Sequence, residues 1–242
     1  MIFNLRVFIG ALFCLVLTFS SPDAFAKTNF KPSYETIAFD VYRDDELFGT
    51  HDITFTTNED GTVTAEIEII LVAKVLGFDA YNYDHVNTET WRDNRLIKLS
   101  SKTIEDGEQD QVEVTVRQDH LDVRGSKFVG NRPMGTFSTS YWNRNIVGKT
   151  ELINSQTGEI VVLDFEPLKK EQAIKAGSHC YKTSGDLELT LCYDVQTNKW
   201  NAMEFDYEGY FIEYRVRPKD QAKPIFDDEP LPEDGEEAAE EE

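Results

Sequence analysis

The sequence has few of the residues that build familiar catalytic and metal sites. It contains only 4 histidines and 3 cysteines in 242 residues, and it has no H-x-H, H-E-x-x-H or C-x-x-C spacing. Metal sites usually draw their ligands from such spacings. The G-x-S-x-G turn of a serine hydrolase is also missing, and no cysteine stands in a papain-like context. We therefore expect no catalytic residue, no metal and no cofactor, with an enzyme of unfamiliar site as a lesser alternative.

Long apolar runs are scarce as well. Arg6 gives a short basic start, Val7–Phe19 is almost wholly apolar, and the Ala-Phe-Ala sequence at 24–26 fits a small-x-small cleavage site. An apolar run of about 13 residues is too short to span a bilayer and is typical of a signal-peptide core. No later segment is apolar enough to cross a membrane. We predict a signal peptide over 1–26, cleavage near Ala26, and a periplasmic or secreted mature chain without a transmembrane segment.

Positive charge is in short supply. The chain has 24 Lys and Arg against 45 Asp and Glu, for a net charge of −21. Ten of the acids and no base lie in 224–242, which leaves −11 on the rest. This balance repels nucleic acid and anionic headgroups, so we expect no nucleic-acid partner. Residues 219–242 are predicted to be a disordered acidic tail, either simply solvated or able to engage a basic protein partner.

Two cysteines, Cys180 and Cys192, remain after the signal peptide. An oxidising compartment and an even count favour a disulfide. A two-residue loop at Ser184-Gly185 would place Cys180 opposite Leu189, whereas direct opposition requires a longer loop. The sequence leaves open a disulfide or two partly buried thiols.

Residues 27–218 are predicted to form a single all-β domain. Segments with a period of two recur between turn residues, for example Ile37, Phe39 and Val41 on one face of 35–43. About eleven such strands, joined by tight turns, must close or fold over to manage their edges. We expect an antiparallel meander that forms an up-and-down barrel or a strongly curved half-barrel, with a β-sandwich as the alternative. At most one short helix is expected, over 169–176, and 125–148 is predicted to be a long loop.

The most informative stretch is Tyr81–Trp91. Its alternation places aromatic rings, an imidazole, an amide and a carboxylate on one face, where a plain β-sandwich would bury aliphatic side chains. This face is either the wall of a polar-aromatic cavity or an outer aromatic surface. The cavity interpretation gives these candidate ligand-binding residues: His51, Tyr81, Tyr83, His85, Glu89, Trp91, Tyr141 and Trp142.

Several motifs carry a resemblance to a known family. They are Gly49-x-His51, Tyr81-x-Tyr83-x-His85 with Glu89-x-Trp91, Tyr141-Trp142, Leu152-x-Asn154-x-x-Thr157-Gly158, and Leu191-Cys192-Tyr193-Asp194 with Trp200. The mature chain up to about Val216 resembles an uncharacterised family of bacterial secreted proteins, a domain of unknown function. It departs from the family pattern at Cys192, where a tryptophan is expected. More distantly, the meander looks like periplasmic lipid-carrier barrels and half-barrels, an analogy of fold that does not establish function.

The function predicted from the sequence is non-catalytic binding of a lipid-like or other apolar ligand in an aromatic-lined β cavity. Pockets of this kind combine apolar and aromatic walls with a few placed polar groups. The alternative is an envelope interaction module whose acidic surface and tail engage a basic partner.

Overall fold

The computed structural model describes residues 31–75 and 78–224. Its first eight strands are β1 (Thr36–Arg43), β2 (Glu46–Thr57), β3 (Val63–Val75), β4 (Phe78–Arg92), β5 (Arg95–Glu105), β6 (Glu108–Val116), β7 (His120–Gly125) and β8 (Val129–Pro133). They are followed by β9 (Phe137–Ser138), β10 (Glu151–Ile153), β11 (Ile160–Pro167), β12 (Ser178–Gly185), β13 (Thr190–Asp194), β14 (Trp200–Tyr207) and β15 (Tyr210–Val216). Two 3-10 turns, η1 (Arg144–Ile146) and η2 (Lys170–Gln172), complete the described elements. The predicted signal peptide and residues 225–242 of the predicted tail lie outside the described residues.

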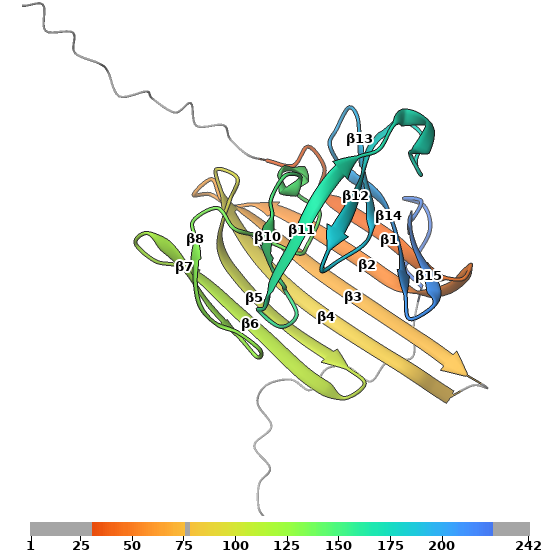
Figure 1. Ribbon diagram of the computed structural model, residues 1–242, viewed down its shortest axis with the longest axis horizontal. Helices are drawn as coiled ribbons and strands as arrows, with labels where there is room; N and C mark the ends of the chain where they lie inside the picture. Colours follow the sequence, from red (N-terminus) through yellow and green to blue (C-terminus); the bar gives the residue numbers. More distant parts are fainter. Residues whose placement is uncertain (1–30, 76–77, 225–242) are drawn as a thin grey trace, which may run out of the picture.

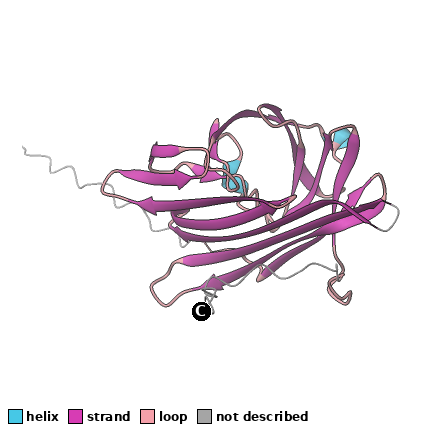
Figure 2. Ribbon diagram, turned by 90° about the horizontal axis from the view of Figure 1, so that it is seen from below, coloured by secondary structure: helices cyan, strands magenta, loops and turns pink. Residues whose placement is uncertain are grey.

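All fifteen strands belong to one sheet, in the order β8-β7-β6-β5-β4-β3-β2-β1-β15-β14-β13-β12-β11-β10-β9. Neighbours pair antiparallel, except that β9 and β10 are parallel. The sheet bends so that β10–β14 lie over the long strands β2–β6 (Figures 1 and 2). The predicted all-β fold class is confirmed, and the structure is the strongly curved half-barrel among the predicted forms.

The two edge strands, β8 and β9, are consecutive in the chain, but no ladder joins them. Turns approach each other across the opening instead, where the Lys127 amide donates to the Thr157 carbonyl at 3.1 Å. Gly125 is needed at this contact, because a Cβ atom there would lie 2.3 Å from the Thr157 oxygen. The half-barrel is thus drawn together by turn contacts without closing.

The structure has more strands than the period-two patterns indicate. The predicted long loop at 125–148 contains β8, β9 and η1, and the segment over 169–176 holds only the single turn η2. β8 carries Gly130 and Pro133, and β9 has two residues. Alternation cannot be recognised in such short segments, and it is the pairing with neighbouring strands that makes them extended.

The interior of the curve is the main hydrophobic core. Ile37, Phe39 and Val41 of β1 all point into it, as their alternation predicts, and each is at most 1% exposed. Trp91, Trp142 and Trp200 are equally buried. All three indole rings belong to this core, together with many aliphatic side chains.

A second, smaller cluster lies on the opposite face of β12 to β14. Cys180 and Cys192 are directly opposed in the ladder and form a disulfide, packed with Ala202. The connection between the two strands runs from 186 to 189, the longer loop that direct opposition requires. Closing a loop of this size stabilises a fold by roughly 3 kcal/mol.

Candidate functional site

The inward face of β4 carries an unusual polar series for a sheet interior. His85, Asn87, Glu89 and Trp91 are all buried, with exposures between 0% and 2%. Alternation along a strand places them on one face, and the curvature turns this face inward. Buried polar groups need partners, so their contacts define what this face does.

Glu89 is the centre of a hydrogen-bond network. Its carboxylate accepts bonds from the indole nitrogens of Trp91, at 2.9 Å, and Trp142, at 3.1 Å. The Ser138 and Ser140 hydroxyls and the Asn87 amide nitrogen also donate to it. Five donors from two separate parts of the chain therefore hold one fully buried carboxylate. Its role is to fix the 138–142 segment against β4.

The two interior histidines occupy one row across the sheet. His51 on β2 pairs with Ile69 on β3, and Ile69 pairs with His85 on β4. The row continues to Thr103 on β5, whose hydroxyl is 2.8 Å from His85 Nδ1. Burial lowers the pKa of His85 to about 4. Burial, together with the nearby His85, lowers the pKa of His51 to about 3. Both imidazoles are therefore neutral at physiological pH.

His51 sits in a cage of aromatic rings. Trp200, Tyr214 and Phe39 approach it edge to face, with ring centroids at 5.2, 5.7 and 6.4 Å. Neither His51 ring nitrogen has a hydrogen-bond partner in the described structure, although the residue is only 3% exposed. Leaving a buried polar group unpaired costs about 1–3 kcal/mol. The packing of the aromatic rings holds the imidazole in place, and both of its nitrogens are unpaired among the described residues.

A cavity of about 210 Å³ lies beside this row. Its walls include His51, Tyr83, His85, Asn87 and Tyr141. None of the fifteen lining residues is Asp, Glu, Lys or Arg. Asn87 Oδ1 is a further buried acceptor without a partner among the described residues, while the amide nitrogen of the same side chain donates to Glu89. The cavity is uncharged and partly aromatic, and two of its lining residues, His51 and Asn87, have side-chain polar atoms without a partner among the described residues.

Tyr141 reaches the cavity through a strained turn. Its φ of 58° lies in the left-handed region, which is uncommon for a residue other than glycine. The Tyr193 hydroxyl donates to the Tyr141 carbonyl at 2.8 Å and holds this turn from β13. Strain of this kind persists only where surrounding contacts impose it, and it is frequent at functional sites.

Four of the eight candidate residues line the cavity: His51, Tyr83, His85 and Tyr141. Glu89 and Trp91 lie in the adjoining network and core. Tyr81 lies near the start of β4, where its hydroxyl donates to Glu105 at 3.0 Å and its ring stacks on Phe48. Some of the candidate residues therefore line the cavity, and the others belong to the structure around it.

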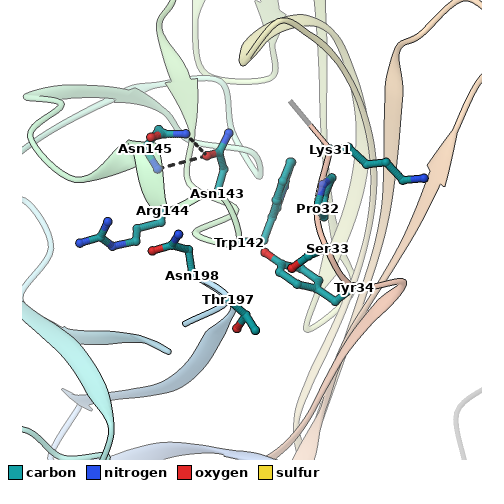
Figure 3. Close-up of a pocket in the computed structure, with 10 residues that line it drawn as sticks. All are labelled: Lys31, Pro32, Ser33, Tyr34, Trp142, Asn143, Arg144, Asn145, Thr197 and Asn198. Carbon is teal, nitrogen blue, oxygen red and sulfur yellow. Dashed lines mark hydrogen bonds between the residues drawn. The ribbon is translucent and has the colours of Figure 1, made fainter. Parts of the chain in front are cut away.

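Trp142 borders a different hollow, of about 350 Å³. This hollow lies between the segment at Pro32–Tyr34 and the polar residues Asn143, Asn145 and Asn198 (Figure 3). Asn143 is committed to structure here, since its Oδ1 accepts from the backbone and side chain of Asn145. This hollow is wider and more polar than the interior cavity.

The sequence reasoning missed several cavity residues. Asn154 and Gln156 enter from the turn between β10 and β11, and Tyr214 enters from β15. The Tyr83 hydroxyl lies 3.4 Å from Gln156 Oε1, and the side-chain nitrogen of Gln156 donates to Glu105 at 2.9 Å. The Asn154-x-x-Thr157-Gly158 motif was the available signal for the turn. For Tyr214, the only indication in the sequence was the period-two alternation of its strand.

No group of three or more His, Cys, Asp or Glu side chains lies close enough to hold a metal ion in the part of the chain that the structure describes. Within the same residues, no helix is both long and apolar enough to cross a membrane.

Fold and site together define a class: a curved β half-barrel with a polar-aromatic cavity in its interior. Residues 39–217 match the model of the family described as "Domain of unknown function (DUF6134)", and the chain belongs to this family. The chain is also similar in fold to a solved structure, a beta-barrel-like protein of domain of unknown function DUF1849 from Brucella abortus. The TM-score is 0.54 at 12% identity, over 75% of this chain and 94% of the other. No curated protein matches the chain. The family and barrel-like fold predicted by resemblance are confirmed.

Proposed function

We propose that this protein is a non-catalytic, periplasmic or secreted binding protein that takes a compact, uncharged ligand into its interior cavity. The observation that carries the proposal is the unpaired His51 ring, which lines the cavity together with Asn87, whose Oδ1 is also without a partner among the described residues. A neutral imidazole has one donor and one acceptor nitrogen, so a ligand with both kinds of group satisfies it. The disulfide supports an oxidising compartment.

The size of the cavity and the absence of charged residues from its lining restrict which apolar or lipid-like ligand it can hold. A cavity of about 150 Å³ admits benzene, so about 210 Å³ accommodates a molecule only somewhat larger. The walls supply no cation to neutralise a carboxylate, and an unpaired charge is costly to bury. The proposed ligand is therefore a small molecule with an aromatic or apolar body and an uncharged hydrogen-bonding group, without a long acyl chain.

The test compares two isosteric probes, benzamide and benzoate, by heteronuclear NMR titration of the full chain. We expect saturable shifts centred on His51 and Tyr141 with benzamide, and at least tenfold weaker binding of benzoate. His51→Phe should abolish the benzamide response, whereas the control His179→Phe, on an exposed histidine, should retain it. Equal binding of both probes, no saturable benzamide response, or an unchanged response in His51→Phe would overturn the proposal.

A further inference from the structure

A separate hollow lies outside the half-barrel, under the segment that connects β11 to β12. We call this segment, residues 168–177, the strap; it includes η2 and lies at the upper right in Figure 1. Its two ends are tied to the sheet region. The Leu168 amide donates to the Cys180 carbonyl at 2.9 Å, and the Val195 amide donates to the Gly177 carbonyl at 3.1 Å. Between these ties, the backbone hydrogen bonds of the strap are local to η2.

The strap covers the sheet face opposite the interior cavity. Leu191 and Tyr193 of β13 belong to the interior core, whereas Cys192 between them belongs to the outer cluster. Leu168 and Ala173 of the strap pack against that outer cluster. The hollow under the strap is therefore separated from His51 by the thickness of the sheet.

The hollow has a volume of about 560 Å³ and a largely apolar lining. Leu168, Ala173, Cys180 and Val195 all contribute to it. Val195 is 46% exposed, so apolar surface remains open to solvent at this point. The disulfide fixes the floor by joining β12 to β13. The hollow is large enough for an alkyl chain, which the smaller interior cavity does not accommodate.

Charge around the strap is opposite to that of the whole protein. Residues 167–182 contain four lysines and one glutamate, in a chain whose net charge is −21. Two of these lysines, Lys170 and Lys175, line the hollow. Neither has a carboxylate partner among the described residues. Cations beside an apolar hollow complement a molecule that has an anionic head and an apolar chain.

We propose that the hollow under the strap binds a single-chain amphipathic anion of the fatty-acid class. Its alkyl chain lies against Leu168, Ala173 and Val195, and its carboxylate lies at Lys170 and Lys175. This site is independent of the interior cavity and of the ligand proposed for it.

Calorimetric titration of the full chain with dodecanoate tests the proposal, with dodecanol as the uncharged probe. We expect saturable binding of dodecanoate, about tenfold tighter than that of dodecanol. The double variant Lys170→Gln/Lys175→Gln should remove this difference. The control Lys98→Gln/Lys219→Gln makes the same change in net charge elsewhere and should retain it. Because all four lysines are exposed or at the rim, these variants should fold.

Two more variants distinguish binding under the strap from binding in the interior cavity. Val195→Asp places a negative charge on an exposed edge of the hollow and should weaken dodecanoate binding at least tenfold. His51→Phe, which alters only the interior cavity, should leave dodecanoate binding unchanged. Absence of saturable binding, equal weakening by both lysine pairs, or loss of binding in His51→Phe would overturn this site. None of these dodecanoate results depends on whether benzamide enters the interior.

Discussion

The indole nitrogen of Trp142 donates a hydrogen bond to the carboxylate of Glu89, 53 residues earlier in the chain. This contact joins the irregular segment after β9 to the C-terminal part of β4. Because Tyr141 precedes Trp142 in a left-handed turn, the same contact helps to set the position of Tyr141 in the cavity wall. One buried carboxylate thus links the core of the half-barrel to its candidate site.

Replacing Glu89 with Leu should destabilise the protein strongly. The change leaves five buried donors without their acceptor. Each buried donor left without a partner costs about 1–3 kcal/mol, so the total loss should exceed about 3 kcal/mol. Urea unfolding followed by tryptophan fluorescence measures the effect. The control Glu66→Leu, on an exposed position of the adjacent β3, should stay within about 0.5 kcal/mol. A loss below about 1 kcal/mol for Glu89→Leu would show that the network contributes little.

The free energy of unfolding should fall as the pH is lowered from 7 to 5. The pKa values of His51 and His85 are about 3 and about 4 in the folded protein, against about 6.5 in an unfolded chain. The unfolded chain therefore takes up protons first as the pH falls, and each histidine costs about 2 kcal/mol of stability over this interval. Urea melts at both pH values measure it. His51→Phe should show a fall smaller by about 2 kcal/mol, and an unchanged fall would contradict the prediction.

Trp91→Ala should cost about 3–5 kcal/mol, as for a large aromatic side chain in a packed core. Trp91 is 1% exposed and packs edge to face on Phe137 and Trp142, at 4.9 and 5.5 Å. Denaturant melts should show this loss, while Tyr210→Ala, at a residue 44% exposed, should change stability little. A cost for Trp91→Ala no larger than that of the Tyr210 control would instead place Trp91 in an open cavity wall.

Deleting residues 225–242 should leave the melting temperature unchanged. This segment is acidic and interrupted by prolines, so it contributes little buried apolar area. Differential scanning calorimetry of the full and shortened chains tests this expectation. A loss of several degrees would show that the segment docks on the body of the protein.

Local pattern was enough to predict much of the fold. The alternation of Ile37, Phe39 and Val41 identifies β1 and its inward face, and the alternation from Tyr81 to Trp91 identifies the polar face of β4. Strands reveal themselves this way because successive side chains point to opposite faces. The short edge strands β8 and β9 were missed because they owe their extended form to their neighbours.

The sequence by itself determined the all-β class, the family resemblance and many of the residues that face the interior. Tertiary structure alone decided that the sheet remains open between β8 and β9, and which of the candidate residues share a cavity. His51 and His85 are 34 positions apart, and their row exists only because β2, β3 and β4 pair in one register. The network around Glu89 likewise depends on tertiary structure, because its partners come from β4 and from a segment about 50 residues later. A pattern along the chain reports which face a side chain occupies, whereas register and curvature determine which side chains meet.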